Sequence, residues 1–245
     1  MAGRVCRQTQ RPFRSMVVLG ESTVEGGPWL RNTGERWADI LHRLLEEAQE
    51  QPLRYHNAGL GASVIAPSSP GYAASNKPSA AERLDGEVIA HKPDLLVIAY
   101  GLNDMRAGMR LADFRAELES VIRRVRTKLT PLIVLVAVYH MSAYDRYAPF
   151  DRGSAAATKR YNARLLSLAK ARGCVFADVW AAEGQADHVV HPDTVHANKL
   201  GNLLIAHEVF EAIVHAAPGI ARNVQRRDAG TEWTRACLGI KKRKT

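Results

Sequence analysis

Short apolar runs alternate with longer segments of helical spacing along most of the chain, and this alternation restricts the fold more than any other feature. The apolar runs have the length of strands and cover residues 15–19, 53–57, 94–100, 132–139 and 174–179. Helical spacing of apolar residues covers 35–49, 79–91, 111–129, 154–172 and 199–216. Strands that alternate with helices form βαβ units, so the sequence predicts a three-layer α/β/α fold with a five-stranded, mostly parallel sheet.

No linker or internal repeat interrupts the pattern, which predicts one domain over residues 15–220. The net charge of +9 lies at the two ends of the chain. Residues 1–14 contain four arginines and no acid, and residues 221–245 contain eight basic residues against two acidic ones. We therefore expect solvated basic tails at 1–14 and 221–245, although such tails can also bind polyanions or membrane surfaces. The domain between them carries no basic face that suggests a nucleic-acid site.

The composition also bears on the cellular compartment. No apolar run approaches the ~20 residues of a membrane helix, and the N-terminal arginines are not followed by the apolar region of a secretory signal. Cys6, Cys174 and Cys237 are far apart, which argues against a disulfide framework and against a cysteine metal site. These features predict a cytoplasmic protein without a transmembrane segment, and they leave the oligomeric state open.

The first polar segment of interest, Gly20-Glu21-Ser22-Thr23, directly follows the first predicted strand. Parallel sheets of this kind bind ligands at the carboxyl ends of their strands. A serine in a tight turn between strand and helix faces solvent, and the N–H groups of the turn can stabilise an oxyanion. The same position also suits a helix-capping serine, so this segment alone does not decide the function.

Two further segments follow the second and third predicted strands. The stretch 57–63 contains Gly59 and Gly61, and glycine lets a backbone N–H approach a ligand closely. The segment Gly101-Leu-Asn103-Asp104 places a side-chain amide at the same edge of the sheet. Each segment is equally compatible with an ordinary loop or an Asn-Asp turn.

The fourth segment, Asp193-Thr-Val-His196, precedes the last predicted helix. A carboxylate three residues ahead of a histidine can accept the Nδ1–H of the ring. That contact fixes the tautomer and leaves Nε2 free to act as a general base. The alternative is a capping aspartate beside an incidental surface histidine.

Together the four segments resemble the catalytic blocks of the SGNH hydrolases, also known as the GDSL esterase/lipase family. They follow that family's order, spacing and positions over residues 15–216. The resemblance implies a flavodoxin-like fold and a serine esterase that forms an acyl-enzyme. It also implies a small-molecule ester as the substrate, with no metal, no cofactor and no nucleic acid required.

The resemblance assigns a role to each of five residues. It implies that Ser22 is the nucleophile, His196 the general base and Asp193 the residue that orients the histidine. It further implies an oxyanion hole made by the N–H groups of Ser22 and Gly61 and by the Asn103 amide.

Three positions bear on how well the family pattern fits. Gly61 is preferred to Gly59 because it begins the Gly-x-Ser pattern typical of the second block. Glu21 stands where the family has Asp, and its extra methylene affects the geometry expected for the oxyanion hole. Asn198 stands where Pro is common.

Other classes of protein fit the sequence less well. An α/β-hydrolase needs Gly-x-Ser-x-Gly, but Val24 occupies the position of the second glycine. A P-loop needs Gly-Lys-Ser/Thr, but Gly26 is followed by Gly27. No dinucleotide-binding Gly-x-Gly-x-x-Gly is present.

Three alternatives for the site itself stay open. His188, His191, Asp193 and His196 lie within nine residues and are plausible zinc ligands, although no His-Glu-x-x-His occurs. An acyltransferase would use the same serine and histidine as an esterase. A relative that binds carbohydrate or lipid without catalysis would keep only the fold.

Two loops leave the carboxyl edge of the predicted sheet and are expected to shape the pocket. The loop 62–79 is rich in Pro, Ser, Ala and Gly, and the loop 139–154 carries aromatic residues among charged ones. Such side chains suit stacking on a sugar or lining a short acyl channel, but they can equally pack on each other. A short-chain acyl ester, an acetylated carbohydrate and a thioester all remain possible substrates.

Overall fold

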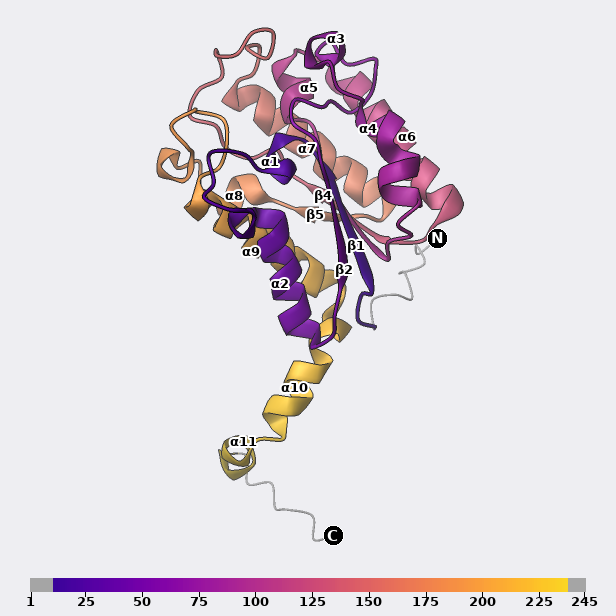
Figure 1. The fold of residues 1–245 in the computed structure, drawn as a ribbon, viewed down its shortest axis with the longest axis vertical. Coiled ribbons are helices and arrows are strands. Elements are labelled where there is room, and N and C mark those ends of the chain that lie inside the picture. The colour runs from indigo at the N-terminus through magenta and orange to yellow at the C-terminus, as the bar shows by residue number, and fades with distance from the viewer. Residues whose placement is uncertain (1–10, 238–245) are drawn as a thin grey trace.

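A computed structural model describes residues 11–237 of the chain and contains one five-stranded sheet (Figure 1). Its strands are β1 (Ser15–Gly20), β2 (Arg54–Gly59), β3 (Leu95–Ala99), β4 (Leu132–Val136) and β5 (Val175–Ala177). The strand order is β2-β1-β3-β4-β5, and every pairing is parallel. The predicted α/β/α fold with five strands is therefore confirmed.

Helices cover both faces of this sheet (Figure 1). On one face α2 (Trp37–Gln49) packs against α9 (Lys199–Ala216), which also contacts α8 (Val179–Ala182). The other face carries α4 (Ala80–Leu84), the π-helical turn η3 (Asp85–Ile89), α6 (Leu111–Lys128) and α7 (Ala155–Arg172). Because both faces are covered, the central strands are buried on each side, which explains their uninterrupted apolar sequences.

The carboxyl ends of the first three strands lie side by side, since Gly20 pairs with both Gly59 and Ala99. Directly beyond them come α1 (Ser22–Glu25) and α5 (Leu102–Arg106). A side chain at Gly59 would be impossible here, because its Cβ would lie 2.1 Å from the backbone nitrogen of Glu25. Glycine thus permits the end of β2 to press against α1. Three of the four polar segments meet at this edge.

Two segments on this half of the molecule differ from their predicted form. Residues 102–106, for which the sequence predicts no helix, form the helix α5, which begins after Gly101 at a φ of 123°. The predicted helix 79–91 is divided into α4, which starts with a capping box at Ser79, and the wider turn η3. The structure offers no evident cause for that widening.

The last two strands, β4 and β5, are shorter than predicted, and each of them ends early for a local reason. The backbone of Val138 leaves the sheet because the Asn162 side chain both donates to its carbonyl (2.9 Å) and accepts from its N–H (2.8 Å). In β5 the strand stops at Ala177, because the next residue, Asp178, caps α8 by accepting the N–H of Ala181. Side-chain amides and carboxylates thus replace the backbone ladder at this edge.

The described parts of the two expected tails are more ordered than predicted. Phe13 is only 2% exposed, and its backbone exchanges two hydrogen bonds with the Gln49 side chain. At the other end, η5 (Pro218–Ala221) packs against α9 and α2, and α10 (Arg222–Ala229) and α11 (Glu232–Cys237) then extend away from the domain (Figure 1). Ordered structure therefore extends past residues 14 and 221, and the predicted domain boundaries at these positions stay predictions. The tail predictions for 1–10 and 238–245 lie outside the described residues.

The remaining elements are short: η2 (Thr33–Glu35), α3 (Tyr72–Ser75) and η4 (Asp187–Val189). Within residues 11–237, no single helix has both the length and the apolar character needed to cross a membrane. One bent pair of helical segments, Lys199–Ala216 with Pro218–Ala229, meets those requirements jointly, with a 96° angle between its halves.

Candidate active site

Ser22 is the first residue of α1, which starts as soon as β1 has ended. Glu21 before it is extended, and its carbonyl accepts the N–H groups of Val24 and Glu25, which closes the turn. The serine side chain is thereby held at the carboxyl edge of the sheet and remains partly exposed. This placement gives the hydroxyl access to solvent on a rigid backbone.

His196 and Asp193 approach Ser22 from the loop before α9. His196 Nε2 lies 2.9 Å from Ser22 Oγ, and His196 Nδ1 lies 2.8 Å from Asp193 Oδ2. The other carboxylate oxygen of Asp193 accepts the N–H groups of Val195 and His196, each at 2.9 Å. The structure thus brings the three predicted side chains into one chain of hydrogen bonds.

The electrostatics of this chain favour a charged aspartate and a neutral histidine. Burial tends to raise the pKa of Asp193, but the hydrogen bonds from His196 and Val195 outweigh it and hold that pKa below its usual value. Burial lowers the pKa of His196, against the opposing effect of Asp193. A neutral ring whose Nδ1–H faces the carboxylate has a free lone pair on Nε2, which is what a general base requires.

An indole ring that the sequence analysis did not single out covers the histidine. Trp29 stacks on His196 with ring centroids 3.6 Å apart and an angle of 8° between the planes. This contact contributes to the burial of the imidazole and fixes its orientation. Nothing in the local sequence around Trp29 pointed to it, because the contact spans more than 160 residues.

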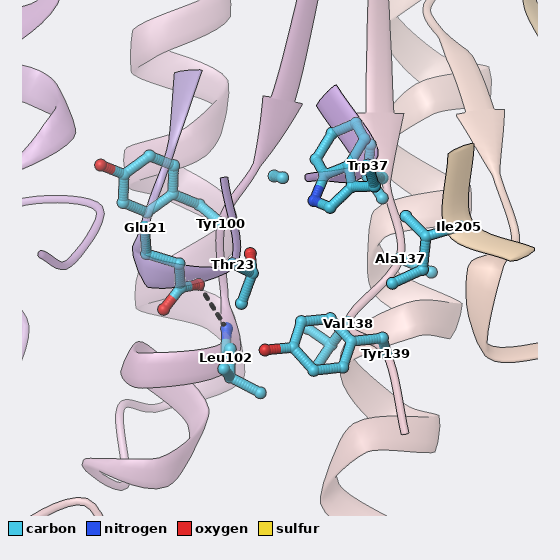
Figure 2. A pocket seen from close by; sticks show the side chains of 11 residues that line it. Glu21, Thr23, Trp37, Tyr100, Leu102, Ala137, Val138, Tyr139 and Ile205 are labelled. Carbon is cyan, nitrogen blue, oxygen red and sulfur yellow. Dashed lines mark hydrogen bonds between the residues drawn. The ribbon is translucent and has the colours of Figure 1, made fainter. Parts of the chain in front are cut away.

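Glu21 connects the nucleophile to α5. Its side chain is 1% exposed, and its two oxygens accept the N–H groups of Leu102 and Asn103, each at 3.1 Å; Figure 2 shows the bond with Leu102. Burial, followed by the charge of Asp104, raises the pKa of Glu21 well above its usual value. The extra methylene relative to aspartate is therefore accommodated, and the longer side chain reaches the start of α5.

Asn103 is 5% exposed and lies at the edge of the sheet beside the second loop. Its Nδ2 donates to the carbonyl of Ser63 at 3.0 Å. A side-chain amide has two hydrogens, so one remains available for a ligand. The adjacent Asp104 is fully buried and accepts the N–H of Ile65, so it supports the loop.

Gly61 lies near the nucleophile, but its N–H is already engaged. A Cβ at Gly61 would be 3.9 Å from Ser22 Cβ, and the Gly61 N–H donates to Glu25 Oε2 at 2.8 Å. Glu25 is exposed, so its side chain can turn away. The N–H of the next residue, Ala62, has no hydrogen-bond acceptor in the described part of the chain, and this residue has a φ of 60°.

A pocket opens beside the nucleophile, under the carboxyl ends of β1, β3 and β4 (Figure 2). Glu21 and Thr23 line it on one side and Tyr139 on another, and the rest of its wall is largely apolar. The Tyr139 hydroxyl points into this space and is buried without a hydrogen-bond partner among the described residues. The predicted loop 139–154 therefore contributes to the walls around the site.

The histidine-rich stretch does not assemble as a metal site. His188 is exposed on η4, whereas His191 Nδ1 accepts the N–H of Asp193 at 3.2 Å. Across residues 11–237, no group of three or more His, Cys, Asp or Glu side chains is arranged to hold a metal ion.

Asn198, which replaces the common proline, caps α9 by accepting the N–H groups of Leu200 and Gly201.

Comparison with known proteins agrees with this geometry. The model of the GDSL-like Lipase/Acylhydrolase family matches residues 18–204, and the chain belongs to this family. It is accordingly a carboxylic ester hydrolase. A comparison with curated protein sequences gives no significant match.

Solved structures with the same fold include two esterases. The acetylxylan esterase Axe2 from Geobacillus stearothermophilus is 19% identical, with a TM-score of 0.61, over 82% of this chain and 94% of that one. A lipase/acylhydrolase from Enterococcus faecalis is 21% identical, with a TM-score of 0.64, over 82% and 95% of the two chains. Catalytic mutants of Axe2, with a serine, an aspartate or a histidine replaced, match as well.

Proposed function

We propose that the chain hydrolyses a carboxylic ester through an acyl-enzyme on Ser22. The observation that carries the proposal is the continuous set of hydrogen bonds from Ser22 Oγ through His196 to Asp193. His196 Nε2 takes the hydroxyl proton as Oγ attacks the ester carbonyl carbon, and Asp193 stabilises the resulting imidazolium. The same proton then passes to the departing alcohol oxygen, which leaves the acyl group on Ser22. A water molecule that gives a proton to His196 then attacks the acyl carbon, and this proton returns to Ser22 Oγ as the acid leaves.

The tetrahedral intermediate needs donors for its oxyanion. The Ser22 N–H at the start of α1 and the free amide hydrogen of Asn103 are two of them in this proposal. The Gly61 N–H is the third once the exposed Glu25 side chain turns away from it. Donors fixed before the reaction stabilise developing charge without reorganising, which is usually a large part of catalysis.

Acetyl esters of carbohydrates are the first substrates to test. Axe2, which shares the fold, acts on acetylated xylan or xylooligosaccharides according to its structures. The exposed Tyr147 and the half-buried Trp29 offer aromatic surface near the triad for a sugar ring. A short acyl ester without a sugar is the alternative, and transfer to an acceptor alcohol would use the same residues.

The test is turnover by wild-type and Ser22→Ala proteins on 4-nitrophenyl esters of increasing chain length and on acetylated xylose. We expect the substitution to abolish hydrolysis while the thermal unfolding curve stays nearly unchanged. The matched control is Thr23→Ala on the next residue, which should lose little activity.

EDTA should leave wild-type activity intact. Loss of activity on chelation, restored by zinc, would favour the metal alternative at the histidine-rich stretch.

A further inference from the structure

Arg106 is the last residue of α5 and is a buried cation without an ionic partner. Its side chain is 4% exposed. None of the ion pairs within residues 11–237 includes it. The nearest partner is neutral, since Nη2 donates to the carbonyl of Arg146 at 3.0 Å. Its Nε is buried and has no acceptor.

The position of this cation relates it directly to the proposed site. Arg106 follows Asn103 by three residues on α5, so the two side chains are neighbours on the same helix face. The guanidinium carbon also lies 5.8 Å from the ring centre of Tyr147, whose hydroxyl donates to the carbonyl of Asp193 at 3.0 Å. Arg106 therefore lies one helical turn from Asn103 of the proposed oxyanion hole. The Tyr147 ring lies between it and Asp193 of the triad.

The surrounding acids do not neutralise this charge. Glu21 uses both oxygens on backbone N–H groups of α5, and Asp151 lies on the exposed loop without an ion pair to Arg106. Tyr139 is nearby, and its hydroxyl also lacks a partner. A buried charge is costly unless it is paired, and no acid among the described residues lies within hydrogen-bond distance of Arg106, so an anionic group on a ligand would compensate this charge.

We propose that Arg106 binds an anionic group, a carboxylate or a phosphate, on the ester that this enzyme hydrolyses. The proposal rests on the ester hydrolase function proposed above and adds a substrate class to it. A guanidinium presents several N–H donors in one plane, and this geometry matches the oxygens of both kinds of anion. The Arg106 Nη1 donates to no residue in the described range and is the atom left for such a contact.

The experiment compares each anionic ester with a neutral counterpart. The pairs are 4-nitrophenyl hemisuccinate with 4-nitrophenyl butanoate, 4-acetoxybenzoate with phenyl acetate, and 4-acetoxyphenyl phosphate with phenyl acetate. The first pair places the anion on the acyl side, and the other two place a carboxylate or a phosphate on the alcohol side. We expect wild type to prefer the anionic member of at least one pair in kcat/KM. Arg106→Gln should reduce that preference by about tenfold or more, chiefly through KM, and Arg106→Lys should retain part of it.

The control is Arg110→Gln, which removes the same charge four residues further on, where the side chain is largely exposed. Arg110→Gln should leave the preference for the anionic ester unchanged if the anion binds Arg106 directly. A similar loss of preference in both variants would instead indicate long-range attraction by the net positive charge of the chain. A structural effect of Arg106 on the loop would lower turnover of both members of a pair equally and leave their ratio intact. An unchanged ratio in Arg106→Gln, or no anionic preference in wild type, would overturn the proposal.

A binding measurement separates this proposal from the ester hydrolase proposal. Calorimetry with Ser22→Ala protein and the same pairs needs no turnover. Tighter binding of the anionic member, lost in the Ser22→Ala, Arg106→Gln double variant, supports the anion site even if wild type hydrolyses none of these esters. Equal binding of both members contradicts the anion site even if wild type hydrolyses them all.

Discussion

Asn103 is the residue whose side chain has one amide hydrogen engaged and one free, beside the proposed nucleophile. If the free hydrogen stabilises the transition state, Asn103→Ala should lower kcat by ~10²–10³ with little change in KM. The measurement is steady-state kinetics on 4-nitrophenyl acetate, corrected for the folded fraction. A variant within about threefold of wild type in kcat would remove Asn103 from the oxyanion hole.

The neighbouring Asp104 provides the matched control for this prediction. It is buried and holds the N–H of Ile65, and burial raises its pKa to about 6. A carboxylate that supports a loop should affect stability more than chemistry. Asp104→Ala should therefore lower the melting temperature and leave the kcat of the folded fraction close to wild type.

Trp29 gives a prediction about pH at the same scale. Burial lowers the pKa of His196, and catalysis needs the neutral ring, so activity should fall only as the pH drops through that lowered pKa, below 6.5. Trp29→Ala exposes the ring to water, which weakens the effect of burial and raises the pKa of His196. The acidic limb of the kcat/KM profile should then move to higher pH. A limb that stays in place would show that the stacked indole does not affect the base.

A buried side chain links two elements of the fold, β1 and α5. Glu21 joins them by accepting two buried N–H groups, so Glu21→Ala leaves both donors unsatisfied. We expect a loss of ~2–4 kcal/mol in the free energy of unfolding. The kcat of the folded fraction should also fall, because Asn103 is no longer held. Glu21→Gln keeps one acceptor oxygen and should lose less on both measures, in urea unfolding and in steady-state assays. Equal behaviour of the two variants would contradict a positioning role.

The elements themselves were largely predictable, and the exceptions have two causes. Strands buried on both faces carry continuous apolar runs, so β1 and β3 are evident from the sequence alone. The ends of β4 and β5 were not evident from the sequence, because the side chains of Asn162 and Asp178 terminate these strands. The backbone groups that these two side chains bind are brought to them by the fold. The helix α5 is not predicted from the sequence, because its five residues are too few to show periodicity.

The C-terminal segment contacts the domain through η5, whose Ile220 is buried in the core, and through α10. Asn223 donates to the carbonyl of Gln49 at 3.0 Å, and Arg227 pairs with Glu50, whereas Trp233 on α11 is 76% exposed. Deletion of residues 230–245 should leave both esterase activity and the melting temperature nearly unchanged. Deletion from residue 222 should lower stability by about 1 kcal/mol, since it removes one hydrogen bond and one partly exposed ion pair. A large loss of activity in the shorter deletion would contradict the account of a self-sufficient domain.

The candidate site was predictable to the extent that its residues lie in short local patterns. Ser22, Asn103, Asp193 and His196 each belong to a segment of four residues at a strand end or a helix start, and the fold brings them together. Trp29, Glu25 and Arg106 belong to no such pattern. Their importance comes from contacts between segments far apart in the sequence, which only the three-dimensional structure shows. Trp29 stacks on His196, Glu25 accepts the Gly61 N–H, and Arg106 lies near the Tyr147 ring.

The proposed function depends on a covalent bond between Ser22 and the substrate, and covalent labelling detects a serine that can form one. Wild-type protein is treated with an organophosphorus fluoride, and the modified peptide is located by mass spectrometry after proteolysis. We expect one label per chain, on Ser22, with activity lost in proportion, and no labelling when His196 is replaced by Ala. Label on another residue, or a fully labelled Ser22 in a protein that still hydrolyses esters, would contradict the proposed function.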